Sequence, residues 1–352
     1  MSEVRVEATN LDRGGKENRV HLIRSDYEGA PSTLCKGCGH DAITASIVTA
    51  CYEANMDPLN MIKLSGIGCS SKTTNYFLNS SFGFNGIHGR MAAMATGVGL
   101  ANRKLMPIGV SGDGDTASIG IGNFSHMIRR GLRMVYVVEN NGVYGLTKGQ
   151  FSATADRGSR LRKGGANPME AIDLPSLAIL MGATFVARSF SGDRKQLAPL
   201  IEAALNHRGT AVLDVLSPCV TFNDHEGSTK SLKNIRAKRD SLNEVDFIPD
   251  FDQINVEYEP GKDLRVRLHN AGMITLHKVK DHDPQNRMAA LGLLEQARAE
   301  GKFLTGLIYI NEDEPDLAEV ENLSEAPLAD LREGELRPDK ASLDSINARF
   351  AI

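Results

Sequence analysis

The sequence predicts an α/β fold, a doubly wound and mostly parallel sheet with extensions at both ends of the chain. Three observations predict it. Short apolar runs alternate with longer helix-like stretches over most of the chain. Two of these runs end in motifs rich in glycine, aspartate and asparagine, and parallel sheets bind ligands at such strand ends. The 352 residues, 41% of them hydrophobic, suffice for one large domain with a buried core.

The expected elements follow one another as a parallel sheet with helices on both faces requires. Strands are expected at 61–65, 107–110, 134–138, 184–189 and 211–216. Helices are expected at 41–55, 90–103, 119–130, 174–181 and 194–207. We find no internal repeat. Beyond residue 223 the alternation becomes less regular.

The first polar motif follows the predicted strand at 107–110 and reads Ser111-Gly112-Asp113-Gly114-Asp115. Gly112 and Gly114 have no Cβ, so the backbone can turn sharply there and approach a phosphate closely. A helix that starts near Thr116 to Ser118 would direct free N–H groups at the same anion. The carboxylate of Asp113 is a hard oxygen ligand of the kind that Mg²⁺ prefers.

The second motif, Asn140-Asn141-Gly142-Val143, follows the predicted strand at 134–138. Asp113 and Asn141 lie 28 positions apart, enough for a crossover helix and a parallel neighbouring strand. Both side chains are then expected at the carboxyl ends of adjacent strands, holding one diphosphate and its Mg²⁺. An ordinary strand–turn–helix with an aspartate cap is the alternative for either half alone.

This pair of motifs resembles the thiamine diphosphate signature, a Gly-Asp-Gly followed by a double Asn. The resemblance implies that Asp113, Asn141 and the backbone carbonyl of Val143 ligate Mg²⁺. It further implies a diphosphate-binding domain whose cofactor contacts include Gly112, Gly114 and Asp115.

Five cysteines without a hydrophobic leader favour a reducing, cytoplasmic setting. Cys35 and Cys38 form a C-x-x-C turn, while Cys69 and Cys219 lie in other turns rich in glycine or proline. Four such sulfurs could bind structural zinc or an iron–sulfur cluster. Their spacing in the sequence does not distinguish these two kinds of site well. Unrelated buried thiols at Cys69 and Cys219 are the other alternative. Cys51 shares a helix face with apolar residues and is expected in the core.

A diphosphate site and a redox cluster in one chain resemble the beta subunit of 2-oxoacid:ferredoxin oxidoreductases, most closely the 2-oxoglutarate type. The resemblance covers about Ala30 to Leu304. Its motifs are 34–40, 66–72, 88–90, 112–115, 140–150, 219–223 and 283–287. It implies that Cys35, Cys38, Cys69 and Cys219 bind one [4Fe–4S] cluster.

The resemblance implies oxidative decarboxylation of a 2-oxoacid to acyl-CoA and CO₂, with 2-oxoglutarate and succinyl-CoA as the first choice. Coenzyme A would be the acyl acceptor and ferredoxin the one-electron acceptor. Pyruvate or a broad range of 2-oxoacids is the alternative. The same enzyme type can run in reverse to fix CO₂, and the sequence does not decide the direction.

Several residues near the motifs are candidates for substrate contact. By resemblance, Lys72 reaches the substrate carboxylate, and a solvated surface lysine is the alternative. The loop after Asn141 covers the cofactor and the substrate pocket in the family. Gly145, Leu146 and Thr147 are expected to contact the diphosphate, with Leu146 and Lys148 shaping acyl-chain selectivity.

His40 and His88 are candidates for pocket polarity or proton transfer, since histidine titrates near neutral pH. Buried histidines that satisfy backbone groups are the alternative. Arg90 is expected to begin the helix at 91–103 or to have another structural role.

The chain shows no pyrimidine-binding domain, which supplies the glutamate that activates thiamine in this family. The resemblance implies that an alpha subunit provides this glutamate and most coenzyme A contacts, in an αβ heterodimer or an (αβ)₂ assembly. This chain alone is therefore expected to be inactive.

The organisation is expected to comprise four parts: a partner-contacting leader at 1–27, the cofactor domain at 28–223, a C-terminal region at 224–305, and an acidic tail at 306–352. Lys230 to Arg239 carries five cations, read as a solvated helix face or a ferredoxin-docking face. A net charge of −4 gives no support for nucleic-acid binding, and no apolar stretch is long enough for a membrane span.

Two other functions remain open at this point. One is a non-oxidative thiamine lyase or synthase with structural zinc. The other is an electron-transfer module that keeps the cluster and has lost the cofactor.

Overall fold

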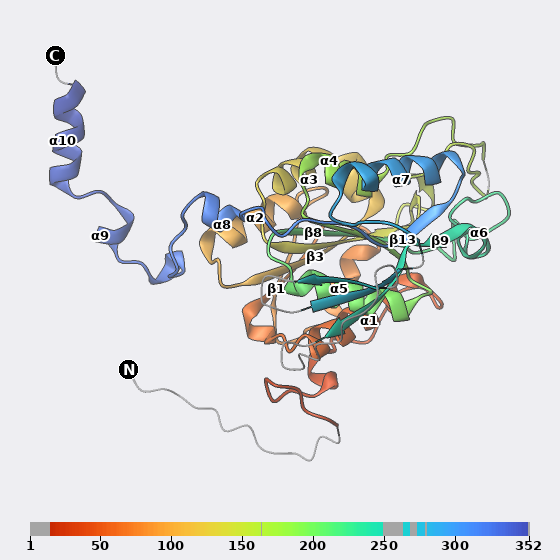
Figure 1. The fold of residues 1–352 in the computed structure, drawn as a ribbon, viewed down its shortest axis with the longest axis horizontal. Coiled ribbons are helices and arrows are strands. Elements are labelled where there is room, and N and C mark those ends of the chain that lie inside the picture. The colour runs from red at the N-terminus through yellow and green to blue at the C-terminus, as the bar shows by residue number, and fades with distance from the viewer. Residues whose placement is uncertain (1–14, 163, 249–262, 268–272, 279, 351–352) are drawn as a thin grey trace.

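The computed structural model describes residues 15–162, 164–248, 263–267, 273–278 and 280–350. Its centre is an eight-stranded sheet with the strand order β2-β1-β3-β4-β8-β7-β13-β9 (Figure 1). Neighbouring strands in this sheet run parallel, except that β13 is antiparallel to β7. The predicted α/β fold with a mostly parallel sheet is therefore confirmed.

The strands of this sheet are β1 (Met61–Ser65), β2 (Phe82–Asn85), β3 (Met106–Gly112), β4 (Met134–Asn140), β7 (Phe185–Phe190), β8 (Thr210–Leu216), β9 (Arg239–Ser241) and β13 (Phe303–Ile310). A short hairpin, β5 (Val143–Tyr144) with β6 (Gln150–Phe151), follows β4. A separate antiparallel sheet consists of β10 (Asn243–Ile248), β12 (Met273–Lys278) and β11 (Asp263–Arg267).

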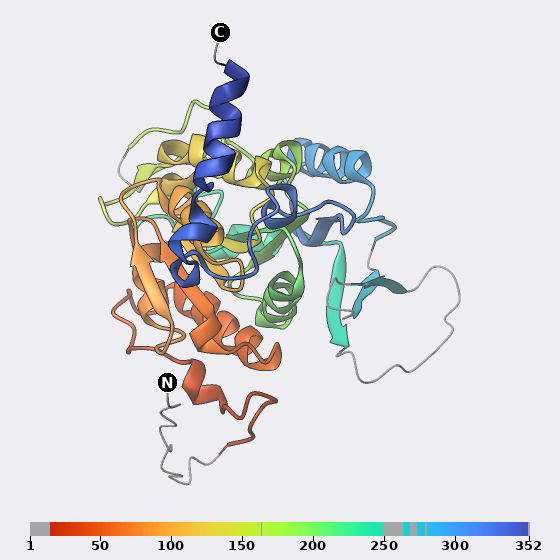
Figure 2. The same cartoon turned by 90° about the vertical axis from the view of Figure 1, so that its left-hand side faces the viewer.

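Helices cover both faces of the large sheet (Figures 1 and 2). One face packs against α1 (Gly39–Glu53) and α5 (Arg194–Asn206). The other packs against α2 (Met91–Ala101), α3 (Ile121–Arg129), α4 (Leu174–Met181) and α7 (Arg287–Ala299). The smaller helix α6 (Leu232–Lys238) precedes β9.

The strands form this two-sided core because successive side chains point to opposite faces of a sheet. In β4, Val135 and Val137 belong to the core under α1 and α5. Met134, Tyr136 and Val138 belong to the core under the other helices. The near-continuous apolar run of β4 is typical of a parallel strand buried on both faces.

The predicted strands and helices of the cofactor domain agree with the structure to within a few residues. The predicted strand at 61–65 and helix at 174–181 have the same bounds as β1 and α4. Helix α4 begins where the Asp173 side chain accepts a hydrogen bond from the Ser176 N–H, and it ends at Gly182, whose φ is +97°. The helix expected at 119–130 is α3 (Ile121–Arg129), and a separate π-helical turn, η4 (Gly114–Ile119), precedes it where the helix start near 116–118 was expected.

Two expected boundaries differ from the structure. The segment 16–27, assigned to a partner-contacting leader, packs on this chain: the Tyr27 side chain is buried and its hydroxyl donates to the Met56 carbonyl. The boundary between 305 and 306 falls inside β13, a strand of the large sheet. The apolar run of β13 is buried like the central strands of the sheet, so the acidic tail begins only beyond it. Residues 1–14 of the leader lie outside the described residues.

The C-terminal arm, residues 321–350, leaves the domain and contains α9 (Glu333–Leu336) and α10 (Lys340–Phe350) (Figure 1). It follows α8 (Leu317–Val320), and neither arm helix buries a residue. Among the described helices, none combines the length and the apolar character needed to cross a bilayer.

Candidate functional site

The carboxyl ends of β3 and β4 bring the two polar motifs together. These strands are parallel neighbours, with Ser111 opposite Val138 and Gly112 opposite Glu139. Asp113 directly follows β3 and Asn141 directly follows β4. The expected placement of the two side chains at adjacent strand ends is what the structure has.

The Asp113 carboxylate is buried among neutral donors. Its Oδ2 accepts hydrogen bonds from the Gly142 N–H at 3.0 Å, from the Thr154 hydroxyl at 2.5 Å and from the Ser152 hydroxyl. Burial raises the pKa of Asp113 above its usual value, and the two hydroxyl hydrogen bonds offset this only in part. Such a carboxylate gains from a cation supplied from outside the chain.

Asn141 is fixed by its own backbone surroundings. Its Oδ1 accepts from the Val143 N–H at 3.0 Å, and its carbonyl accepts from the Asn223 side-chain amide at 2.7 Å. Gly142, which lies between Asn141 and Val143 in the chain, has a φ of +74°, a conformation that suits glycine. Asp113, Asn141 and the carbonyl of Val143 thus present hard oxygens on two adjacent loops, a donor set that fits Mg²⁺.

Asp115 links the surrounding loops. Its Oδ1 accepts from the Gly89 N–H at 2.9 Å and lies 2.6 Å from the His88 Nδ1, while its Oδ2 accepts from Ser111 at 3.0 Å. A Cβ on Gly66 would lie 1.8 Å from Asp115 Oδ2, so the loop can pass only as glycine. The Asp115 oxygens are therefore used inside the chain, and Asp115 positions the residues around the cofactor site.

The two glycines of the first motif pack closely against other loops. A Cβ on Gly114 would lie 2.4 Å from the Tyr144 ring, whose hydroxyl donates to the Gly114 carbonyl at 3.2 Å. A Cβ on Gly112 would lie 3.2 Å from the Ser70 hydroxyl. The absence of side chains at these positions lets the loops after β1, β3 and β4 meet.

The four cysteines come from three loops at this same edge. Cys35 and Cys38 form a turn closed by a backbone hydrogen bond of 2.9 Å and by Gly37 at a φ of +82°. Burial raises the pKa of the Cys38 thiol to about 12. Burial also raises the pKa of Cys69, and the nearby thiols of Cys219 and Cys35 add to that effect. The sulfurs are therefore close enough to affect one another.

Gly145 lies against two of these sulfurs. A Cβ there would lie 3.5 Å from the Cys69 Sγ and 3.6 Å from the Cys219 Sγ. All four thiols are free. Four free cysteines on three neighbouring loops, two of them with their sulfurs beside Gly145, are a donor set that fits an iron–sulfur cluster. The described residues contain no group of three or more His, Cys, Asp or Glu side chains arranged around a single metal ion.

His40 and Glu139 form a buried pair beside the cysteines. The His40 Nδ1 lies 2.8 Å from the Ser217 hydroxyl and 3.5 Å from the Glu139 Oε2. Burial lowers the pKa of His40 to about 4 and raises that of Glu139 well above its usual value. Burial therefore favours the neutral form of both side chains, and the contacts of His40 with Ser217 and Glu139 favour a structural role for it. His88 differs, because half of its side chain is exposed.

The remaining predicted contact residues are more exposed than Asp113 and Asn141. Leu146, Thr147 and Lys148 are exposed on the β5–β6 hairpin loop. The Thr147 hydroxyl donates to Gln150 Oε1 at 2.5 Å. Lys72 is half-buried in the 3₁₀ helix η3 (Ser70–Asn75), three residues after Cys69, and its charge lowers the pKa of Cys69 slightly against burial.

Sequence reasoning missed the residues that support the site from behind. Ser152 and Thr154 hold Asp113, and Lys230 holds their loop by donating to the Thr154 carbonyl at 2.6 Å. Lys230 is 3% exposed and pairs with Asp156 at 2.9 Å, so its assignment to a solvated or docking face is wrong. Glu139 could have been singled out from the sequence, because it is a charged residue at the end of a buried apolar strand.

Cys51 is fully buried in the core of the α1 face, as predicted. Arg90 occupies the N-cap position of α2 without a side-chain capping hydrogen bond, and its guanidinium donates to the Gly89 carbonyl at 3.3 Å.

Comparison with known proteins gives a consistent result. Residues 66–215 match the family of thiamine pyrophosphate enzymes, C-terminal TPP binding domain. The chain is 46% identical over 194 residues to 2-oxoacid:ferredoxin oxidoreductase 1, subunit beta, of Aeropyrum pernix, and the match covers 55% of this chain and 60% of the relative. It is 41% identical over 221 residues to the 2-oxoacid:ferredoxin oxidoreductase subunit beta of a Sulfolobus species, covering 62% and 70%.

A solved structure has the same fold over nearly all of its length. It is a 2-oxoglutarate:ferredoxin oxidoreductase from Magnetococcus marinus with 2-oxoglutarate, coenzyme A and succinyl-CoA bound. Its chain is 30% identical, with a TM-score of 0.70, and the match covers 92% of this chain and 96% of that one.

Proposed function

The chain belongs to the beta subunits of thiamine pyrophosphate-dependent 2-oxoacid:ferredoxin oxidoreductases, and from this we propose that it works with an alpha subunit to decarboxylate 2-oxoglutarate oxidatively. The products would be succinyl-CoA and CO₂, with ferredoxin as the electron acceptor and coenzyme A as co-substrate. The alpha subunit would supply the activating glutamate and most coenzyme A contacts. The oligomer would be αβ or (αβ)₂.

One observation carries this proposal. The segment from Asn141 to Gly145 connects the expected Mg²⁺ ligands to the cysteine sulfurs, with a Cβ position on Gly145 3.5 Å from the Cys69 Sγ. Four residues of chain span at most about 14 Å. The cofactor and the redox centre would therefore lie within one short loop of each other. A non-oxidative thiamine enzyme has no need of four cysteines at this place.

The residues would divide the work as follows. Asp113, Asn141 and the Val143 carbonyl would hold Mg²⁺ and through it the diphosphate. Cys35, Cys38, Cys69 and Cys219 would hold one [4Fe–4S] cluster. When bound, thiamine diphosphate supplies the electron sink for decarboxylation and the cluster supplies one-electron chemistry. The exposed loop at 145–148 is suited to cover the substrate and exclude water.

The preference for 2-oxoglutarate rests on Lys72. Its side chain is half-buried beside Cys69, where an ammonium group can meet the second carboxylate of a dicarboxylic substrate. The Mycobacterium tuberculosis relative, 40% identical over 203 residues, or 56% of this chain and 52% of that relative, is a 2-oxoglutarate oxidoreductase subunit.

The central test is the chain co-expressed with its alpha subunit and purified without oxygen. We expect visible absorbance from the cluster and ferredoxin reduction that requires a 2-oxoacid, coenzyme A and thiamine diphosphate. The variant Cys219→Ser should lose ferredoxin reduction, whereas Cys51→Ser, a buried cysteine away from the site, should retain the cluster spectrum. Colourless protein that carries zinc would contradict the proposal, as would full activity without the alpha subunit.

The substrate preference has its own test. Replacing Lys72 with Met should raise KM for 2-oxoglutarate roughly tenfold, the effect of one lost charge-assisted contact, and change KM for pyruvate much less. Steady-state kinetics on both substrates measure this. Equal effects on the two would show that Lys72 does not read the second carboxylate.

A further inference from the structure

The end of β4 holds a buried carboxyl, that of Glu139, whose role the site description leaves open. Side chains alternate along a strand, so Glu139 lies on the same face of β4 as Val135 and Val137. Helix α1, whose N-cap residue is Cys38, packs on this face. Glu139 is therefore on the side of the sheet from which one of the cysteine turns approaches.

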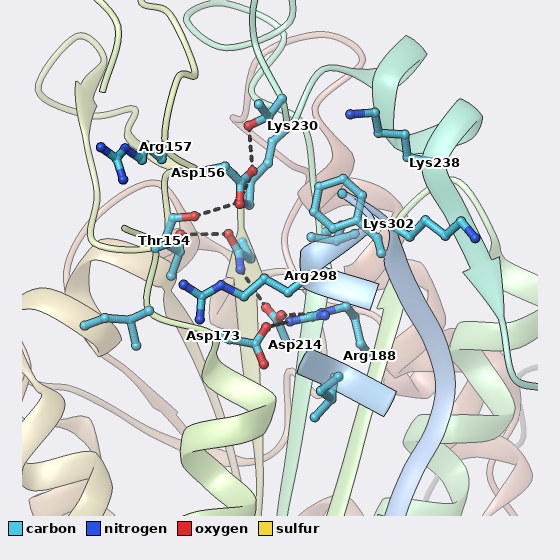
Figure 3. Close-up of a pocket in the computed structure, with 18 of the residues that line it drawn as sticks. Thr154, Asp156, Arg157, Asp173, Arg188, Asp214, Lys230, Lys238, Arg298 and Lys302 are labelled. Atoms are coloured by element: carbon cyan, nitrogen blue, oxygen red, sulfur yellow. Dashed lines mark hydrogen bonds and ion pairs between the residues drawn. The ribbon is translucent and has the colours of Figure 1, made fainter. Parts of the chain in front are cut away.

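Glu139 differs from Asp173 and Asp214, the buried carboxylates on the other side of β4, in having no cation. Asp214 pairs with Arg188 at 2.8 Å, and Asp173 shares the same guanidinium (Figure 3). Among the described residues, no lysine or arginine pairs with Glu139, and its Oε1 has no hydrogen-bond partner. A fully buried polar atom without a partner is rare and needs an explanation.

The other carboxyl oxygen of Glu139 contacts two of the cysteine-bearing loops. The Thr73 hydroxyl donates to Oε2 at 3.3 Å, and Thr73 lies in η3, which begins directly after Cys69. The His40 Nδ1 lies 3.5 Å from the same oxygen, and His40 lies in the first turn of α1, which begins directly after Cys38. One oxygen thus joins the loops of two expected cluster ligands.

His40 extends these contacts to the third loop. Its Nδ1 lies 2.8 Å from the hydroxyl of Ser217, which precedes Cys219 by two residues. Thr73, His40 and Ser217 are all buried, so water does not compete for these contacts. Glu139 and its partners therefore connect the three loops that carry all four expected cluster ligands.

Glu139 is also close to the sulfurs themselves. Burial is the main cause of the raised pKa of the Cys38 and Cys69 thiols, and the carboxyl charge of Glu139 adds to the shift of both. The carboxyl is thus near two expected ligands as well as connected to their loops.

We propose that Glu139 is a positioning residue for the expected iron–sulfur cluster, which holds the loops of Cys38, Cys69 and Cys219 in the arrangement that lets their sulfurs bind one cluster. The inference rests on the function proposed above, in which these cysteines bind a [4Fe–4S] cluster. Replacing residues that orient metal ligands from behind commonly costs about ten- to a hundredfold in metal affinity.

The test uses the chain co-expressed with its alpha subunit and purified without oxygen. Glu139→Met fills a similar volume without a hydrogen-bonding oxygen, whereas Glu139→Gln keeps an oxygen that can accept from Thr73. We expect Glu139→Met to release its iron to a chelator roughly tenfold faster than the wild type. Glu139→Gln should release iron at the wild-type rate.

Electron paramagnetic resonance of the reduced cluster gives a second measurement. The wild type and Glu139→Gln should each show a single set of g values. Glu139→Met should show a broadened or divided signal, because the cysteine loops would no longer keep one arrangement around the cluster. A residue that only stabilises the fold would leave this signal unchanged.

Thr73→Val provides an independent variant. It removes the hydroxyl that donates to Glu139 and should also speed iron release, but it should add little in the Glu139→Met background. The matched control is Thr96→Val, because Thr96 is also buried and its hydroxyl donates to the Ala92 carbonyl within α2. This variant should release iron as the wild type does.

Wild-type iron release together with a wild-type signal in Glu139→Met would overturn the inference. So would equal acceleration by Thr73→Val and Thr96→Val, which would mean that iron loss follows general destabilisation. If Glu139→Met does not fold, the comparison of Thr73→Val with Thr96→Val decides alone. Wild-type protein that binds no iron would instead contradict the proposed function, on which the inference rests.

Discussion

Asn140 forms hydrogen bonds with two groups of polar side chains. The carboxylate of one group has neutral partners, whereas the carboxylates of the other are paired with a cation. On one side, its Oδ1 accepts from Thr154 at 3.0 Å, next to Asp113. On the other, its amide donates to Asp214 at 2.8 Å, next to Arg188. Asp113 meets hydroxyl and N–H donors, whereas Asp173 and Asp214 share a guanidinium.

The difference shows in how the two sites titrate. Burial raises the pKa of Asp113, and neither the hydroxyl hydrogen bonds nor the smaller effect of the Lys230 charge reverses it. Burial also acts to raise the pKa of Asp173, but the charge of Arg188 and the hydrogen bonds outweigh it and leave that pKa below its usual value. The chain supplies a cation where the carboxylate maintains the fold. It leaves Asp113 ready for a cation from outside.

The largest expected effect is on the group that has its own cation. Arg188→Met should lower the free energy of unfolding by about 3–5 kcal/mol, because Asp173 and Asp214 would remain with an unpaired buried charge. Urea unfolding measures this. The control Arg208→Met breaks a half-exposed pair with Glu319 at 2.7 Å and should cost less than about 1 kcal/mol. Similar losses of unfolding free energy in the two variants would mean that the buried ion pairs of Arg188 stabilise the fold no more than the half-exposed pair of Arg208.

Asp113→Asn should affect cofactor binding much more than the stability of the chain. The free energy of unfolding of the chain without cofactor should change by less than about 1 kcal/mol, since the neutral donors keep an acceptor. Cofactor affinity should fall by more than about a hundredfold, beyond the effect of losing a residue that only supports a metal ligand.

Thermal unfolding with and without Mg²⁺ and thiamine diphosphate measures both parts of that prediction. Wild-type protein should be stabilised by the cofactor, because a ligand that binds the folded state shifts unfolding. Asp113→Asn should show no such stabilisation at the same cofactor concentration. A variant that still responds would mean that Asp113 is not a ligand.

Glu202 on α5 is a third kind of carboxylate, because the charge that affects its pKa belongs to another acid, Glu53. Burial, with a smaller contribution from Glu53, raises its pKa to about 8. The unfolded chain loses this proton near pH 4.5 while the folded chain keeps it to about pH 8. The free energy of unfolding therefore falls as pH rises through that window.

Glu202→Gln removes this penalty. The free energy of unfolding of the variant should equal that of the wild type near pH 4 and exceed it by about 1–2 kcal/mol at pH 8. Partial exposure of the side chain to solvent reduces the full effect. Urea unfolding at pH 4, 6 and 8 measures it. Glu226→Gln, at an exposed position, serves as the control. A difference in unfolding free energy that is constant across these pH values would contradict a raised pKa of Glu202.

Much of the fold was predictable because its signals are local. The apolar run at 61–65 and the capped, glycine-ended helix at 174–181 each specify their own bounds. The π-helical turn between Asp113 and α3 was not predictable. That turn contains Asp115, whose carboxylate accepts a hydrogen bond from Gly89 on a distant loop as well as from the nearby Ser111.

The sheet type, the Asp113 and Asn141 pair and the four candidate cluster cysteines could all be predicted from local patterns, because each motif lies at the end of its own strand or turn. The residues that surround these motifs could not. Ser152 and Thr154 reach Asp113 from about forty residues away in the chain, and Lys230 reaches the Thr154 carbonyl from 76 residues away. Such contacts arise from packing between distant segments, which no local pattern of residues specifies.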